Sequence, residues 1–501
     1  MAVGQTAKKT DNKQKKQTSH WLILILLALA QFMVVLDVSI VNVALPAIQR
    51  AFTMSQTSLQ WIITAYTLTF GGFLLLGGRA ADLFGRRKIF MMGVILFTLA
   101  SLADGLSQSG GMLIIFRGLQ GLAGAFMSPA ALSIILVTYR EGHERNVALS
   151  VWGSVAAGGA AVGVLLGGII TQYLNWRWNF FVNVPVGIGV ITTALRILDR
   201  HDSKIEHNDL DLPGAVLVTG GLMLLVYALV KAPSLGWTDH TTLICFGISL
   251  AAIAGFIANE MRVRNPLMPL RIFRLRNLSG ANALQLLMAA GMFSIFFFST
   301  LYLQEVLGYT PIRTGVSFLL IPVIIAITAT NVPRLVAKIG YRPILMVSPL
   351  FVSAGLFWLS HIPVHGTYWH DVAPGMAVMA LGMGATFVSV TIAATSGVPH
   401  NEAGLASGLL NTMQQIGGAL GLAVLTGIAT SSSARYIQNL HLHAAPGHEV
   451  IAAATVHGFH DGYLIASTFG IGASLIAIFV LRNQKAKTDP SHHEPVIVPG
   501  H

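Results

Sequence analysis

The chain has 501 residues, of which 54% are hydrophobic and only 10% charged, and its mean hydropathy is +0.68. A soluble surface needs roughly a quarter of charged residues, so this composition excludes an ordinary soluble enzyme and predicts a membrane protein. The single cysteine, Cys245, excludes an intramolecular disulfide and a thiol metal cluster, whereas the net charge of +11 leaves nucleic-acid binding open until the charges are located.

Fourteen apolar segments follow one another along the chain, and each is long enough to cross a bilayer core of about 30 Å as a helix. Helices are favoured because each one satisfies its own backbone hydrogen bonds in lipid. We therefore expect an all-α membrane protein. The predicted spans are 21–46, 58–81, 88–107, 111–138, 147–172, 178–199, 212–232, 241–260, 279–306, 313–333, 343–361, 372–397, 403–431 and 460–482.

An internal repeat divides these spans into two halves. The string GRAADLFGRR, from Gly78 to Arg87, follows the second span, and PRLVAKIGYR, from Pro333 to Arg342, follows the tenth. Parallel six-span halves are a known transporter plan. The predicted parts are a disordered cytoplasmic tail over 1–20, an N-terminal half over 21–199, a linker with two extra spans over 200–278, a C-terminal half over 279–482 and a cytoplasmic tail over 483–501.

The basic residues predict the orientation of the spans. With the N-terminus in the cytoplasm, 25 of the 31 lysines and arginines fall in cytoplasmic segments and 5 in outer segments, which leaves Arg117 inside a span. Such a bias predicts that both termini are cytoplasmic and that the protein lies in the cytoplasmic (inner) membrane. It also accounts for the net charge, so we expect no nucleic-acid partner.

No segment is long and polar enough for a catalytic domain, so we expect no enzyme and no cofactor. The chain contains no Gly-Lys pair, which excludes the phosphate-binding loop of ATP-driven proteins. Energy must then come from a gradient, or transport must be passive. Histidines are scattered through the predicted outer loops, and we expect no metal site among them.

The loop between the second and third spans reads GGRAADLFGRRK. Its glycines permit a tight turn and close helix approach, and its aspartate can lie against the N-terminus of a neighbouring helix. We interpret the loop as a conformational latch formed by Gly78, Asp82, Gly85, Arg86 and Arg87. The alternative is an ordinary basic loop.

This loop resembles the signature loop of the major facilitator superfamily. Three further strings resemble its fourteen-span drug:proton antiporter branch: LDVSIVNVALP from Leu36, WRWNFFVNVPVG from Trp176 and NEAGLASGLLNTMQQIGGALGLAV from Asn401. The resemblance implies the major facilitator fold, with fourteen spans in a 6+2+6 arrangement, two pseudo-symmetric six-helix halves and multidrug efflux. It implies protons and a small-molecule substrate as partners besides membrane lipid, and some relatives in double-membrane bacteria also work with a periplasmic adaptor protein.

Two charged residues lie deep inside predicted spans. Asp37 is midway along the first span, where an ionised carboxylate is costly, so it should face a cavity or a partner and can exchange a proton. Arg117 stays charged when buried, and it matches the family's arginine that is implicated in proton coupling. We expect both to couple transport to protons; the alternatives are a structural carboxylate and a helix-packing arginine.

The fifth span carries glycines that recur every four residues. We expect Gly159, Gly163 and Gly167, together with Gly168, to form a helix-packing seam. Antiporters of the family usually carry Gly-Pro before the Gly-Gly pair, whereas this chain has Val164 in place of the proline. This departure gives weight to a second hypothesis, a specific metabolite exporter or uncoupled facilitator of the same fold.

Uncharged polar and aromatic residues on several spans suit a roomy pocket for lipophilic or cationic compounds. Those predicted to line a substrate cavity are Gln120, Gln285, Tyr302, Asn411 and Gln415. The alternative is that they only join helices by hydrogen bonds.

These features together predict a proton-coupled exporter of drugs or other amphipathic small molecules that works by alternating access. A membrane sensor without transport is a hypothesis of another class. Two costly buried charges, Asp37 and Arg117, argue against it.

Overall fold

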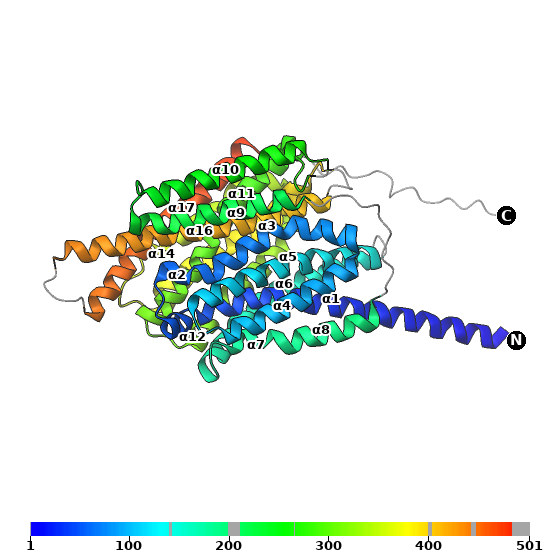
Figure 1. The fold of residues 1–501 in the computed structure, drawn as a ribbon. Helices are drawn as coiled ribbons and strands as arrows, with labels where there is room; N and C mark the ends of the chain where they lie inside the picture. The colour runs from blue at the N-terminus through cyan, green and yellow to red at the C-terminus, as the bar shows by residue number, and fades with distance from the viewer. Residues whose placement is uncertain are drawn as a thin grey trace.

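Helices account for the regular secondary structure in the described part of the chain. The computed structural model describes residues 2–139, 143–198, 211–264, 266–398, 403–441 and 447–482. Within these ranges, fourteen helical segments are long and apolar enough to cross a membrane, and they lie side by side in one elongated bundle (Figure 1). The prediction of an all-α membrane protein with fourteen spans is confirmed.

The N-terminal half contains the first six spans. α3 and α4 both pack along α5, and α1 packs along α6 and also touches α5. These pairings bring α1 into contact with α5 inside the half. The helices are α1 (Ala2–Phe52), α2 (Gln56–Leu59), α3 (Trp61–Phe84), α4 (Arg86–Leu106), α5 (Gly110–Thr138), α6 (His143–Tyr173), α7 (Trp178–Phe181) and α8 (Asn183–Ile197).

The C-terminal half repeats this plan, and three of its spans are each divided into two elements. α14 packs along α15 and α17, and α11 packs along α16. The helices are α11 (Arg276–Leu301), the π-helix η2 (Tyr302–Val306), α12 (Pro311–Phe318), α13 (Leu320–Ile339), α14 (Tyr341–Leu359), the π-helix η3 (Tyr368–Val372), α15 (Ala373–Thr395), α16 (Ala403–Asn439) and α17 (His448–Phe479).

The two extra spans, α9 (Leu212–Leu235) and α10 (His240–Arg262), lie between the halves in sequence and at one edge of the bundle in space (Figure 1). They pack against each other, and α9 also packs against α3 and α16. A short 3-10 helix, η1 (Leu270–Arg274), then leads into α11. The extra pair is therefore an addition beside the junction of α3 and α16 and not part of either six-helix core.

The internal repeat is visible in the backbone of the two corresponding loops. Gly85, between α3 and α4, has φ = 98°, and Gly340, between α13 and α14, has φ = 82°. Glycine adopts such positive φ values without the steric cost that a side chain brings. Equivalent turns thus join equivalent spans, as two pseudo-symmetric halves require.

The outer surface of the bundle carries large apolar side chains. Ile115, Leu195 and Leu250 are 66%, 57% and 70% exposed in the isolated chain. So extensive an apolar surface is unfavourable in water but is solvated by lipid. The surface therefore agrees with a multi-pass integral membrane protein.

The structure differs from the expected boundaries at two places. α1 begins at Ala2, whereas we expected a disordered segment over 1–20. This stretch contains no proline and continues a stable membrane helix, so it elongates that helix without a new nucleation step. The expected parts at 200–210 and 483–501 lie outside the described residues.

The second difference concerns the last two spans. α16 continues to Asn439 and α17 begins at His448, so both extend well past the expected limits of 403–431 and 460–482 (Figure 1). Polar residues in these extensions reduce hydropathy but do not oppose a helix, and antiparallel packing of α16 on α17 stabilises both. Most of the outer loop that we expected there is helical.

Candidate functional site

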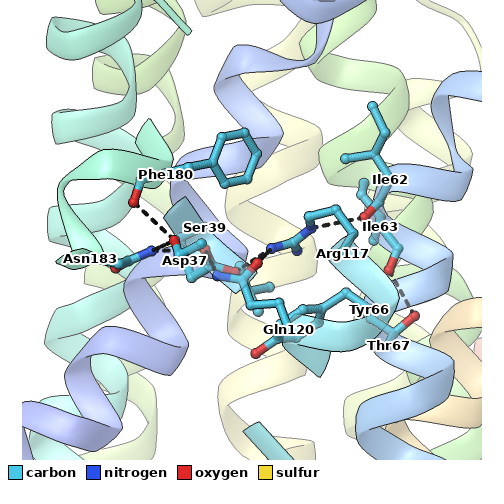
Figure 2. A network of polar contacts seen from close by, with 12 residues as sticks. Asp37, Ser39, Ile62, Ile63, Tyr66, Thr67, Arg117, Gln120, Phe180 and Asn183 are labelled. Atoms are coloured by element: carbon cyan, nitrogen blue, oxygen red, sulfur yellow. Dashed lines mark hydrogen bonds and ion pairs between the residues drawn. The ribbon is translucent and has the colours of Figure 1, made fainter. Parts of the chain in front are cut away.

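An ion pair lies in the interior of the N-terminal half. The Nη1 atom of Arg117, on α5, donates a hydrogen bond of 2.5 Å to Oδ2 of Asp37, on α1 (Figure 2). Arg117 is 1% exposed and Asp37 is fully buried. The two charged residues that stood out in the sequence are therefore each other's partners, inside two membrane spans.

Neutral amides complete the hydrogen bonding of Asp37. Its Oδ1 atom accepts from Nε2 of Gln120 at 2.9 Å and from Nδ2 of Asn183 at 3.0 Å, while Oε1 of Gln120 accepts from Arg117 Nη1 at 2.5 Å (Figure 2). Three donors thus surround one buried carboxylate. These hydrogen bonds hold the carboxyl group of α1 to α5 and α8 at once.

Arg117 is fixed on its other side by α3. Its Nε atom donates to the carbonyl oxygen of Ile62 at 3.1 Å, and its guanidinium carbon lies 4.3 Å from the ring centre of Tyr66 (Figure 2). A cation over an aromatic face is stabilised most where water is excluded. The guanidinium is therefore oriented by a carboxylate, a backbone carbonyl and an aromatic ring at once.

The network continues from Asn183 to α4. Nδ2 of Asn183 also donates to Oγ of Ser101 at 3.1 Å, and Ser101 donates to the carbonyl oxygen of Phe180 at 2.9 Å. Asn183 begins α8 and Phe180 lies in α7. One polar cluster thus connects six of the helices of this half: α1, α3, α4, α5, α7 and α8.

Sequence reasoning missed three members of this region. Asn183 belongs to WRWNFFVNVPVG, but its role in holding a carboxylate has no signal in a single sequence. Ser101 is equally ordinary in an apolar span. Asp104, on α4, did carry a signal, because a carboxylate within the predicted span 88–107 is costly in lipid. Because Asp104 lies next to the end of that span, where a charge is ordinarily solvated, the sequence alone did not single it out.

The structure separates the residues that we expected to line a substrate cavity. Gln120 joins the Asp37 cluster, whereas Gln285 is buried in α11. The hydroxyl of Tyr302 donates to the carbonyl oxygen of Pro363 at 2.6 Å, so its fully buried side chain joins η2 to the loop between α14 and η3. Asn411 and Gln415 lie on α16, where the Gln415 side chain rests against α3 at Gly71.

The proposed latch residues lie at one end of the bundle, here called the loop end; the opposite end is called the far end. Asp82 accepts from Nη2 of Arg86 at 3.2 Å and from the Ser133 hydroxyl at 3.5 Å, and Nη2 of Arg87 donates to the carbonyl oxygen of Leu195 at 3.3 Å. All of these partners belong to the N-terminal half. The aspartate side chain is 55% exposed.

Close helix approach in this region depends on Gly77. A Cβ atom there would lie 2.0 Å from the Ala125 carbonyl oxygen of α5, whereas one at Gly78 would be 3.6 Å from its nearest neighbour, in Pro129. The tight turn depends on Gly85, with its positive φ. Gly77 thus permits the close helix approach and Gly85 permits the tight turn, whereas Gly78 has neither role.

The glycines of α6 lie against two different helices. Gly163 lies against Ser39 of α1, where an added Cβ atom would be 2.6 Å from the serine Cβ atom, and Gly159 and Gly167 continue this face. Gly168 instead lies against Pro311 of α12, with a corresponding distance of 2.6 Å to its carbonyl oxygen. The glycine seam therefore packs within the first half and also touches the second.

The two halves meet closely at the far end. A Cβ atom at Gly315 of α12 would lie 2.4 Å from the Val164 carbonyl oxygen of α6, and Nε2 of Gln304 donates to the carbonyl oxygen of Val43 at 2.9 Å. Towards the loop end, α6 instead borders a groove of about 520 Å³, which is lined by Phe32, Val147, Ser150, Val151, Ser154, Val155, Gly158, Gly159 and Val162.

Comparison with known proteins supports a transport function for this architecture. The profile of the Major Facilitator Superfamily matches residues 27–422. The puromycin resistance protein pur8 of Streptomyces alboniger is 39% identical over 460 residues, which cover 91% of this chain and 90% of that protein. The cephamycin export protein CmcT of Amycolatopsis lactamdurans is 36% identical over 436 residues, which cover 85% and 89%.

A solved structure shows the same fold at lower identity. It is a bacterial homologue of the human lysosomal transporter Spinster in an inward-facing, unoccupied conformation, with a TM-score of 0.65 and 16% identity. The likeness covers 92% of this chain and 97% of that one. The chain is therefore a multi-pass membrane transporter and not an enzyme, and it belongs to the major facilitator superfamily.

Proposed function

We propose that this transporter exports drugs or other amphipathic small molecules across the cytoplasmic membrane in exchange for protons. Export is supported by relatives that are named for puromycin resistance and cephamycin export. Proton exchange is supported by one observation above all: the Asp37–Arg117 pair, buried inside two spans. Charges in such a position are costly and are typical of ion and proton pathways.

Protonation of Asp37 changes the forces that hold α1 to α5. The ionised carboxylate is attracted to Arg117 and accepts from Gln120 and Asn183. A proton removes the negative charge and occupies one of the acceptor positions, so Arg117 is left buried without a full counter-charge. This change biases the half between two arrangements, which is how a local charge can drive a conformational transition.

We place the loop end in the cytoplasm, because the basic residues of the chain concentrate in the segments at this end. The contacts of Gly168 and Gly315 then close the transporter to the outside, and the groove along α6 opens towards the cytoplasm. Alternating access requires that these far-end contacts separate while the loop end closes.

We assign the latch function of the signature loop to the conformation in which the loop end is closed. Asp82 is half-exposed and bonded only within its own half in this conformation, as far as the described residues show. We propose that closure of the loop end brings Asp82 against the C-terminal half, where a helix N-terminus would stabilise its charge. The latch thus regulates the conformational equilibrium and does not bind the substrate.

Proton release from energised membrane vesicles tests this proposal. Lipophilic cations are added on the substrate side, and the luminal pH is followed for wild type and for Asp37→Asn, with Asp239→Asn as a control that removes only a capping carboxylate of α10. We expect a substrate-triggered flux in wild type and control that is lost in Asp37→Asn. Absence of flux over a broad panel, with correctly folded protein, would indicate a narrow-specificity or uncoupled carrier.

A further inference from the structure

A second carboxyl group lies near the Asp37 cluster without a hydrogen bond. Asp104 is on α4, inside the span Arg86–Leu106, and its side chain is fully buried. Neither Oδ1 nor Oδ2 has a hydrogen-bond partner among the described residues. Asp37, which is equally buried, has three donors. Two carboxyl groups of the same half therefore lie in opposite environments.

Burial without partners disfavours an ionised carboxylate. A charge removed from water must be compensated by hydrogen bonds or by a direct counter-charge, and Asp104 has neither in contact. A neutral, protonated carboxyl avoids most of this cost. Asp104 therefore lacks both the hydrogen-bond donors and the direct counter-charge that surround Asp37.

Asp104 nevertheless lies within the electrostatic reach of the Asp37 cluster. Arg117 and Asp37 are the two charged groups that act on it. Ser101, one helical turn earlier on the same face of α4, is hydrogen-bonded to Asn183, which holds Asp37. The two carboxyl groups are thus linked by one helix face and one arginine.

The ionisable groups around this part of α4 give a simple charge balance. α5 contributes Arg117, α1 contributes Asp37 and α3 contributes Tyr66. Before α7, Arg177 directs its Nη1 atom to the carbonyl oxygens of Gly105 and Ser107, at 2.8 and 2.6 Å, and forms no ion pair with Asp104. The buried cluster therefore contains one cation and two carboxyl groups.

We propose that Asp104 is a second proton-binding residue, and that Asp37 and Asp104 share one negative charge beside Arg117. In this conformation Asp37 is ionised and Asp104 holds the proton. When Asp37 is protonated, Arg117 lacks a counter-charge, so ionisation of Asp104 becomes favourable. Coupled titration of this kind belongs to the pair and not to either residue alone.

The proposal deepens the proposed function, on which its role in transport rests. Asp104 lies three residues before Ser107, at the far end of α4, whereas Asp37 is in the middle of α1. Exchange of the charge between them moves the proton-binding position along the membrane normal. The pair would thus store a proton on the outer side of the cluster while Asp37 is engaged with Arg117.

Infrared difference spectroscopy of the purified protein tests the assignment. Protein with carbon-13-labelled aspartate separates the aspartate bands from those of Glu260 and Glu305, which also lie in spans. We compare the carbonyl band of protonated carboxyl groups in wild type, Asp104→Asn, Asp37→Asn and the control Asp239→Asn at neutral pH. Size-exclusion chromatography verifies that each variant is folded.

We expect Asp104→Asn to lose the equivalent of one protonated aspartate, and Asp239→Asn to lose none. Asp37→Asn should also lose this band, because Asp104 then ionises to balance Arg117. An unchanged band in Asp104→Asn would overturn the assignment, and loss there with retention in Asp37→Asn would overturn the sharing of charge. If Asp37→Asn does not fold, Arg117→Gln decides: without the cation neither carboxyl group needs to be ionised, so the band should grow by one protonated aspartate, and an unchanged band would overturn the sharing of charge.

The infrared experiment and the proton-release experiment test the two proposals independently of each other. The infrared experiment needs no transport, so a carrier without proton coupling could still show the shared proton. Conversely, export could be coupled to protons through Asp37 although the aspartate band is unchanged in Asp104→Asn. In that case only the proposal on Asp104 is wrong. Each outcome therefore identifies which of the two proposals is wrong.

Discussion

Replacement of Gly77 by alanine should destabilise the protein far more than the same change at Gly78. An added Cβ atom at Gly77 would lie 2.0 Å from the carbonyl oxygen of Ala125 and 2.8 Å from its carbonyl carbon. Both atoms belong to the backbone of α5, so no side-chain rotation relieves the contact and α3 must move away from α5. At Gly78 the nearest atom, Cβ of Pro129, would be 3.6 Å away, which is an ordinary contact.

The two variants add the same methyl group one residue apart, so their difference isolates the close approach at Gly77. Overpacking of a tightly packed interior costs about 1–3 kcal/mol, and a contact between two backbones places Gly77→Ala at the upper end of this range. Alanine in place of glycine within a helix is favourable by about 1 kcal/mol, so Gly78→Ala should be neutral or stabilising.

Thermal unfolding in detergent, followed by tryptophan fluorescence and by size-exclusion chromatography of heated samples, measures the difference. We expect a lower melting temperature for Gly77→Ala and a value at or above that of wild type for Gly78→Ala. Equal melting temperatures for the two variants would refute the packing argument. A larger loss for Gly78→Ala would show that the signature position itself, and not the neighbouring glycine, controls the approach of α3 to α5.

Three further changes test other contacts. Arg117→Lys keeps the positive charge but loses the planar fork, so substrate efflux from vesicles should fall at least about tenfold; wild-type efflux would mean that charge alone suffices. Gly315→Ala places a Cβ atom 2.4 Å from the Val164 carbonyl oxygen and should separate the far ends of α6 and α12, which spin-label distances would detect as a longer separation. Tyr463→Phe removes a buried hydrogen bond of 2.8 Å to Ser299 and should cost about 1–3 kcal/mol in thermal unfolding; an unchanged melting temperature would show that Ser299 finds another partner.

The positions of the spans could be predicted because lipid imposes a strong and local constraint. An apolar run of about 20 residues must become a helix, whatever surrounds it. The ends of the helices obey no such rule. α16 and α17 continue into polar sequence that hydropathy does not mark as part of a span. Packing between helices, which a hydropathy pattern does not record, decides these details.

The candidate site could be predicted only as far as its charges. Asp37 and Arg117 were conspicuous because a charge in a span is rare, and they are partners in the structure. Asn183 and Ser101 are neutral, so their contribution depends on where the helices bring them. Asp104 lies where a helix end would ordinarily be solvated, and only the packing of the neighbouring helices makes it buried.

The account depends most on the coupling of substrate and proton through Asp37, and proton release on substrate binding measures this coupling directly. Purified transporter in weakly buffered solution is mixed with a lipophilic cation, and the pH change is recorded across a range of starting pH. We predict that wild type and Asp239→Asn release protons as substrate binds, and that Asp37→Asn binds substrate without any release. Equal proton release by Asp37→Asn and wild type would contradict the account.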